Sequence, residues 1–142
     1  MQLIIGGAFS GKRKVVRKQN EKCSWVSAYD GDAIIDWKTN WVKDTTLVME
    51  GWEKWITTEL KKNESNDEIR KKFSTFFQNL VEKEQKRENE VVLVMLEVGK
   101  GIVPLENNDR RLRDLAGWIA QDAAIMAGRV NYVWNGYAKR LK

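Results

Sequence analysis

Short apolar runs alternate with amphipathic stretches along the chain. Five runs lack a clear polar alternation, which is typical of strands that are buried on both faces of a sheet. The expected strands cover residues 2–5, 23–28, 46–50, 91–96 and 130–134. The run Val91 to Leu96 is the most apolar of them and predicts a central parallel strand.

Helical patterns lie between these runs. Ser65 and Glu68 have the spacing of a capping box, and Ile69, Phe73, Phe76, Phe77 and Leu80 behind them follow helical spacing. The expected helices cover residues 11–21, 33–44, 52–60, the stretch after Ser65, and 106–127. Strands that alternate with helices predict a three-layer α/β fold with a mostly parallel central sheet, formed by one domain over residues 1–142.

The loop after the first expected strand has the pattern of a phosphate-binding loop. Its residues, Gly6, Gly7, Ala8, Phe9, Ser10, Gly11 and Lys12, show the spacing G-x-x-x-x-G-K and open a helix. Backbone N–H groups of such a loop surround phosphate oxygens, and the lysine reaches the β and γ phosphates. We therefore expect a P-loop NTPase fold that binds ATP or GTP.

The residue after this lysine departs from the pattern. A Ser or Thr normally follows the lysine and binds Mg²⁺ through its hydroxyl, but this chain has Arg13. Arg13 cannot bind a metal ion, and it can instead add positive charge against the phosphates. The sequence leaves open whether nucleotide binding is accompanied by catalysis.

Carboxylates at the ends of expected strands are the candidate Mg²⁺ ligands and catalytic groups. Glu50 follows the strand 46–50 and is the first candidate for the metal, and Glu97 follows the strand 91–96. Asp30 and Asp32 follow the second strand. All four are expected at the carboxyl edge of the sheet, where open α/β sheets bind ligands. For each one taken alone, a capping or solvated carboxylate is an alternative.

Composition narrows the function classes. The chain contains no histidine, which excludes histidine-based acid–base catalysis and histidine metal ligands, and its one cysteine excludes an internal disulfide. No apolar run approaches the ~20 residues that cross a membrane, and the N-terminus lacks the pattern of a signal peptide, so we expect a cytoplasmic protein. The formal charge of +5 suits nucleoside triphosphates as well as nucleic acid. Because the basic cluster from Lys12 to Lys18 begins within the phosphate loop, we do not expect nucleic acid as the partner.

The seven tryptophans divide into two groups. Trp25, Trp52, Trp55 and Trp134 are expected in the core, whereas Trp37, Trp41 and Trp118 are not placed by the pattern, and an exposed one can stack on a base or a corrin ring. The cluster of Arg110, Arg111 and Arg113 near a helix start either reaches phosphates or forms a solvated, ion-paired face.

Three stretches resemble the adenosylcobinamide kinase/adenosylcobinamide-phosphate guanylyltransferase family of cobalamin biosynthesis. They are the phosphate loop, the segment from Leu47 to Ile56, and the segment from Glu97 to Pro104 with the helix after it. The third is the specific one, because its sequence E-V-G-K-G-I-V-P is similar to a signature of this family. The residues from Gly136 to Lys142 also resemble the family's closing sequence.

This resemblance implies two reactions. A kinase step moves the γ-phosphoryl group of ATP or GTP to the aminopropanol hydroxyl of adenosylcobinamide, with Lys12, Glu50 and Glu97 at the site. A second step joins GMP to that phosphate through a guanylylated histidine, which this chain lacks. The expected function is therefore an adenosylcobinamide kinase without the guanylyltransferase step, and the alternative is a non-catalytic nucleotide- or corrinoid-binding protein. The resemblance also implies a homo-oligomer.

Overall fold

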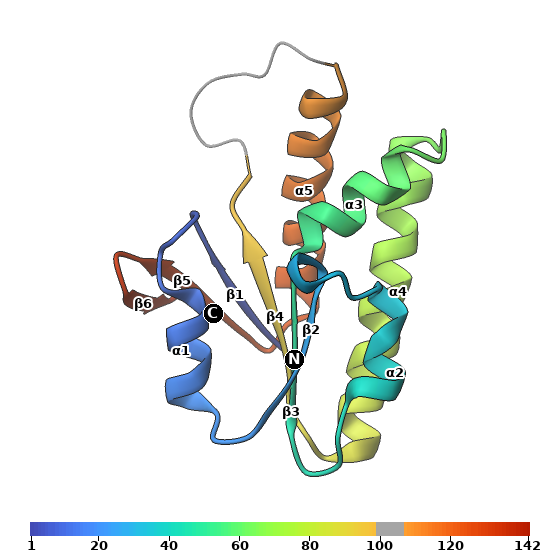
Figure 1. Ribbon diagram of the computed structural model, residues 1–142. Helices are drawn as coiled ribbons and strands as arrows, with labels where there is room; N and C mark the ends of the chain where they lie inside the picture. Colours follow the sequence, from blue (N-terminus) through green and yellow to red (C-terminus); the bar gives the residue numbers. More distant parts are fainter. Residues whose placement is uncertain (99–106) are drawn as a thin grey trace.

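The chain folds around one six-stranded sheet in the order β2-β3-β4-β1-β5-β6. The computed structural model describes residues 1–98 and 107–142. The strands are β1 (Gln2–Gly6), β2 (Cys23–Ser27), β3 (Thr46–Glu50), β4 (Val91–Leu96), β5 (Arg129–Trp134) and β6 (Tyr137–Arg140). Strands β1 to β5 are parallel, and β6 runs antiparallel to β5. Figure 1 shows that the carboxyl ends of the parallel strands point to one edge of the sheet.

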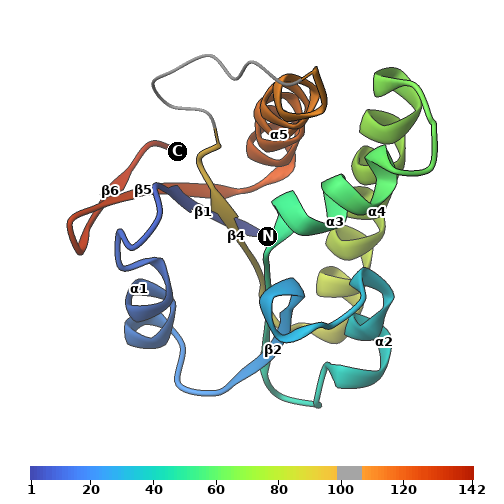
Figure 2. The same ribbon diagram turned by 45° about the horizontal axis from the view of Figure 1, so that its top comes forward.

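Helices cover both faces of this sheet, which confirms the predicted three-layer α/β fold. Helix α1 lies on one face, and the longer helices lie on the other (Figure 2). The helices are α1 (Lys12–Gln19), α2 (Trp37–Asn40), α3 (Trp52–Leu60), α4 (Asn66–Arg87) and α5 (Asn107–Met126), with short 3₁₀ turns η1 (Ala28–Asp30) and η2 (Ile34–Asp36).

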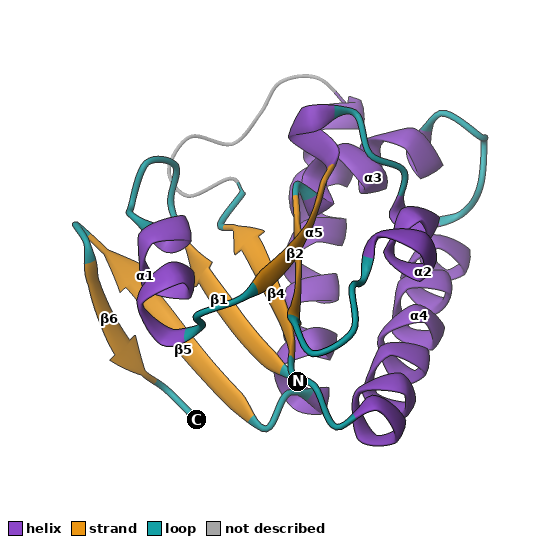
Figure 3. Ribbon diagram, turned by 60° about the horizontal axis from the view of Figure 1, so that its bottom comes forward, coloured by secondary structure: helices purple, strands orange, loops and turns teal. Residues whose placement is uncertain are grey.

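The core is divided unequally by the sheet. The larger cluster lies between the sheet and the long helices, where Trp52 packs edge-on against Trp55 and Phe77 at centroid distances of 5.0 and 5.3 Å. The smaller cluster packs Val15 and Val16 of α1 against valines of the sheet. Figure 3 shows α1 alone on its side of the sheet among the described helices.

The hydrophobic pattern placed most elements correctly, and the exceptions have physical reasons. The predicted helix 33–44 is two short pieces that end at Asn40, because Trp41 is extended and its indole N–H donates to the carbonyl of Thr45 at 2.9 Å. Strand β6 was not predicted, because its four residues are all exposed and carry no apolar alternation.

The structure corrects the predicted burial of Trp134 and places the three tryptophans that the pattern left open. Trp134 is 66% exposed at the end of β5 rather than buried. Trp37 and Trp41 are core residues, in contact with each other at a centroid distance of 6.3 Å, and Trp118 is partly exposed on α5. Trp37 and Trp41 are therefore not stacking platforms for a ligand.

Strand β1 occupies the position in the sheet that matters for function. It lies between β4 and β5, and the chain leaves it through α1 to reach the distant edge strand β2. In open α/β sheets, ligands bind where the order of strands reverses in this way. The loop from Gly6 to Lys12 leaves β1 at this point.

No helix within residues 1–98 and 107–142 has both the length and the apolar character needed to span a membrane.

Candidate functional site

The loop between β1 and α1 is held tightly at both ends. At Gly6, a Cβ atom would lie 2.3 Å from the carbonyl oxygen of Val133, so only glycine fits between β1 and β5. Gly11 has a φ of +95° and lies beside Gly136, whose N–H donates to the carbonyl of Ser10 at 2.7 Å. The β5–β6 turn therefore supports the loop from outside.

The side chain of Lys12 folds back over this loop. Its Nζ donates to the carbonyl oxygens of Gly7 at 2.6 Å and Gly6 at 3.2 Å. Burial lowers the pKa of Lys12 below its ordinary value, and the charges of Glu53 and Glu50 partly oppose that effect. An anion beside Lys12 would favour its charged form and so oppose the effect of burial on its pKa.

A cavity of about 750 Å³ opens beside the loop. This volume is in the range of small-molecule sites, about 300–1,000 Å³. Four of its lining side chains are basic: Lys12, Arg13, Lys14 and Arg17. The other lining residues are Ala8, Phe9, Ser10, Gly11, Tyr29, Glu50, Glu53, Val94 and Leu96.

Two further features of this cavity suit a phosphate group. The N-terminus of α1 is at the loop, with no acidic residue in its first turn. The hydroxyl of Ser10 is buried and has no hydrogen-bond partner among the described residues, whereas buried polar atoms are normally paired. A phosphate oxygen would supply that partner, so the residues present fit a polyphosphate ligand.

Arg13 and Glu50, which both line the cavity, form a bidentate ion pair. Nε of Arg13 donates to Oε2 of Glu50 at 3.0 Å, and Nη2 donates to Oε1. The hydroxyl of Ser27 also donates to Oε1, at 2.8 Å. The carboxylate of Glu50 is buried, and its hydrogen bond raises the pKa of Arg13 above the ordinary value. Glu50 thus accepts two hydrogen bonds from the cation Arg13 and a third from the hydroxyl of Ser27.

This arrangement does not fit Mg²⁺ at Glu50. Mg²⁺ requires oxygen ligands, and Arg13 offers only N–H donors where a hydroxyl would bind the metal. Both oxygens of Glu50 already accept hydrogen bonds. Among the described residues, no group of three or more carboxylate or thiol side chains is arranged for a metal ion. The role of Glu50 as a Mg²⁺ ligand stays a prediction, against which this geometry argues.

The other predicted carboxylates are not gathered into the cavity. Glu97 follows β4, donates its N–H to the carbonyl of Gly6 at 2.9 Å, and accepts a hydrogen bond from the hydroxyl of Tyr132 at 2.7 Å. Asp32 accepts from the N–H of Ser27 at 2.9 Å and so closes a turn. Asp30 is exposed in η1, near enough to Arg13 for its charge to act on it. Of the E-V-G-K-G-I-V-P segment, residues 99–104 lie outside the described residues.

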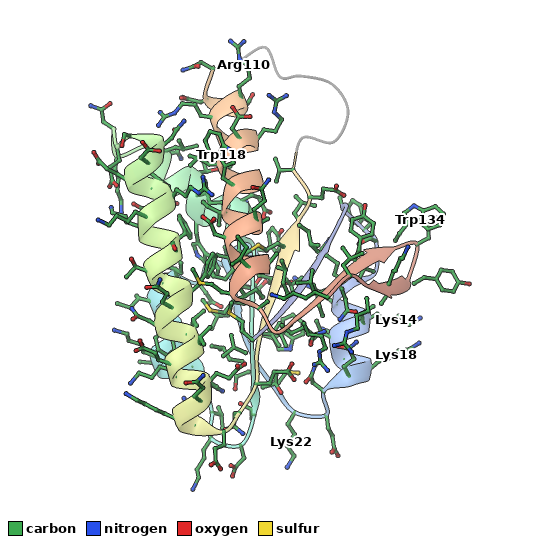
Figure 4. The ribbon with its side chains drawn as sticks, turned by 180° about the vertical axis from the view of Figure 1, so that it is seen from behind. Lys14, Lys18, Lys22, Arg110, Trp118 and Trp134 are labelled. Atoms are coloured by element: carbon green, nitrogen blue, oxygen red, sulfur yellow. The ribbon has the colours of Figure 1, made fainter. Side chains whose placement is uncertain are left out.

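The arginines Arg110, Arg111 and Arg113 of α5 also lie outside the cavity. Arg111 donates to the side-chain oxygen of Asn66 and the carbonyl of Glu64, both at 2.9 Å, and so joins α5 to the start of α4. Arg113 pairs with Asp114 at 3.3 Å. Arg110 is exposed at the end of α5, far along the helix from β5 (Figure 4). Neither Arg111 nor Arg113 lines the cavity at the loop.

Glu53 and Tyr29 line the cavity and were not among the site residues predicted from the sequence. Glu53 is in the first turn of α3, and one of its oxygens accepts a hydrogen bond from the hydroxyl of Tyr29. Its other oxygen is buried without a partner among the described residues. Burial first, and then the hydrogen bond to Glu53, raise the pKa of Tyr29 above its ordinary value. The sequence offered one signal for Glu53: it follows Glu50 by three residues, across a glycine, at the start of the next helix.

Together the parallel sheet, the strand reversal at β1 and the loop before α1 define an α/β protein of P-loop NTPase-like fold. A model of the cobinamide kinase / cobinamide phosphate guanyltransferase family matches residues 33–141. The chain belongs to this family, which acts in cobalamin biosynthesis with nucleoside triphosphates and cobinamide as substrates. The match includes Glu50 and Glu97 and begins after the loop from Gly6 to Lys12. A comparison with curated proteins gave no match.

Proposed function

We propose that this chain is an adenosylcobinamide kinase, which transfers the γ-phosphoryl group of ATP or GTP to the aminopropanol hydroxyl of the corrinoid. The observation that carries this proposal is the phosphate cradle at the end of β1. There a basic cavity and a half-buried Lys12 meet the Ser10 hydroxyl, which has no hydrogen-bond partner in the described part of the chain. Membership of a family named for cobinamide kinase supports the acceptor.

Each residue of the cradle has a proposed task. Backbone N–H groups of the loop and Ser10 hold the β and γ phosphates, and Lys12 turns from the Gly7 carbonyl to neutralise the charge that develops in the transition state. The substrate oxygen forms a bond to the γ phosphorus, the bond to the β-phosphate oxygen breaks, and the nucleoside diphosphate leaves. The proton of the attacking hydroxyl goes to a carboxylate.

Two carboxylates are candidates for that proton. Glu53 has a buried oxygen without a partner among the described residues and lines the cavity. Glu97, which the family resemblance implies at the site, follows the strand adjacent to β1. Glu50 contributes by holding Arg13, and so Lys12 and Arg13 are the proposed cationic groups against the phosphates.

We further propose that the guanylyltransferase step is absent. That step needs a histidine to carry GMP, and the sequence contains none. The product of this chain would then be the phosphorylated corrinoid, which a separate guanylyltransferase would consume.

A second function has an observation in its favour. A non-catalytic nucleotide- or corrinoid-binding protein would retain the phosphate cradle and lose the metal site, and the Arg13–Glu50 pair is what such a loss would leave. The two functions share binding and differ in turnover.

Mass spectrometry of the reaction products tests both functions. Purified protein is incubated with adenosylcobinamide and ATP or GTP, with and without Mg²⁺, beside Lys12→Ala, Glu53→Gln and Glu97→Gln. A corrinoid heavier by one phosphate, lost in Lys12→Ala, supports the kinase, and the carboxamide variant that loses product identifies the proton acceptor.

Three other results have distinct meanings. Triphosphate binding without product favours the non-catalytic protein. No binding of triphosphate by the folded protein contradicts the kinase and any nucleotide-binding function, and leaves only a corrinoid-binding protein. A corrinoid that carries GMP would show that the argument from the missing histidine is wrong.

A further inference from the structure

The carboxylate of Glu50 is buried and has a cation beside it. Its side chain is 4% exposed, and an ionised carboxylate at that depth requires a paired charge or hydrogen-bond donors. Arg13 supplies the charge through two donors, and Ser27 supplies a third hydrogen bond. The pair therefore satisfies most of the acceptor positions of Glu50 with groups of this chain.

Arg13 itself faces two ways. About half of its side chain is exposed, and it lines the cavity beside Lys12 and Lys14. The fork toward Glu50 uses Nε and one hydrogen of Nη2, so the remaining N–H groups of the guanidinium are available to another acceptor. Guanidinium groups bind phosphate oxygens well, because their donors match the spacing of those oxygens.

We infer that the guanidinium of Arg13 takes the place of the divalent cation at Glu50, so that this pocket binds a nucleoside triphosphate without a metal ion bridging the protein and the phosphates. The positive charge is built into α1 and is held in position by Glu50. The consequence is a nucleotide affinity that does not depend on Mg²⁺. This inference rests on the proposed nucleotide binding and concerns binding alone.

The opposite result would follow from an exchange of partners at Glu50. If bound triphosphate drew Arg13 away from Glu50, the freed carboxylate would accept Mg²⁺, and affinity would rise with the metal. The structure argues against this exchange, because it would break two hydrogen bonds to a buried carboxylate, and breaking such a pair is costly.

The experiment measures the dissociation constant of a non-hydrolysable triphosphate by calorimetry, in excess Mg²⁺ and in excess EDTA. For the unaltered protein we expect the two constants to agree within about threefold, which is a small free-energy difference. Glu50→Gln should weaken binding by the same factor in Mg²⁺ and in EDTA, because Glu50 acts through Arg13. Arg13→Ser supplies the missing hydroxyl and frees Glu50, so its affinity should become at least about tenfold higher with Mg²⁺ than without it.

Lys18→Ser is the matched control. It removes one positive charge from the same helix at an exposed position outside the cavity (Figure 4), and should leave the ratio of the two constants unchanged. If Arg13→Ser does not fold, as judged by circular dichroism, the unaltered protein and Glu50→Gln still decide. Binding by the unaltered protein that weakens about tenfold or more in EDTA overturns the inference and leaves the proposed function intact. Absence of binding in both solutions overturns the proposed function and the inference together.

Discussion

At the scale of single residues, adjacent Lys12 and Arg13 differ in how their charges are held. Arg13 is fixed by a carboxylate, and its pKa is raised, so it is charged at every pH at which the protein is folded. Among the described residues, Lys12 donates hydrogen bonds only to backbone carbonyls, and burial lowers its pKa. As the pH rises, Lys12 is therefore the first of the two to lose its charge.

Nucleotide affinity should therefore fall as the pH rises from neutrality toward 10.5, the ordinary value for lysine. The pKa of Lys12 is lowered in the free protein and rises when phosphate binds, so binding takes up a proton in the interval between the two values. In that interval the affinity falls by about tenfold per pH unit at most, and calorimetry in buffers of different ionisation enthalpy checks the proton uptake.

Lys12→Arg provides the control, because arginine does not titrate in this range. Its affinity should be flat over the same pH interval. An unaltered protein whose affinity is equally flat would contradict the assignment of Lys12 to the phosphates.

At the scale of elements, the β1–loop–α1 unit explains why the site was predictable in part. The buried strand, the glycines and Lys12 are contiguous in sequence, so the local pattern alone predicted a glycine-rich loop between β1 and α1. That this loop binds phosphate stays a prediction. The Arg13–Glu50 pair joins residues 37 positions apart, one in α1 and the other at the end of β3, and no local pattern encodes such a pair. The short apolar strands were predicted for the same reason, whereas β6 has no buried face and therefore no apolar pattern in its sequence.

The tryptophans show the same limit. Trp52 and Trp55 lie three residues apart on one helix face, and both were correctly expected in the core. Trp134 has the same local signature as a core-strand residue, but it ends the strand at a hairpin turn and is exposed. Which end of a strand reaches beyond the covering helices is decided by the packing of the whole sheet.

The close approach of β1 and β5 predicts that Gly6→Ala destabilises the protein. The new methyl group would lie 2.3 Å from the backbone oxygen of Val133, which cannot move without disturbing the parallel pairing of β1 with β5. We expect a loss of about 2 kcal/mol or more in the free energy of unfolding, measured by urea denaturation.

Gly7→Ala is the matched comparison, since a Cβ at Gly7 has no neighbour within 4 Å. It should change the free energy of unfolding by less than about 0.5 kcal/mol. Equal losses in the two variants would show that strain in the loop, rather than contact with β5, keeps glycine at position 6.

At the scale of the whole molecule, the two edges of the sheet differ. The edge strand β2 is followed by η1, η2 and α2, and Trp37 and Trp41 bury that side of the larger core. The opposite edge strand β6 is exposed at all four residues and, within the described chain, pairs only with β5. Trp134 and Tyr137 are exposed beside each other across this hairpin, with Trp134 at its tip (Figure 4). An open strand edge with aromatic side chains is typical of a surface that pairs with another chain.

We therefore predict that the homo-oligomer implied by the family resemblance forms through β6, and that Trp134→Ser shifts it toward the monomer. Removing the indole takes away the largest apolar contact available at this edge, while the backbone pairing of β5 with β6 remains. Light scattering over a range of protein concentrations measures the change. Ile35→Ser is the control, because Ile35 is also an exposed apolar residue but follows the opposite edge strand, and its removal should leave the mass unchanged. If the unaltered protein is a monomer at all concentrations, the oligomer prediction is wrong. If Ile35→Ser dissociates the oligomer and Trp134→Ser does not, the contact lies at the β2 edge instead.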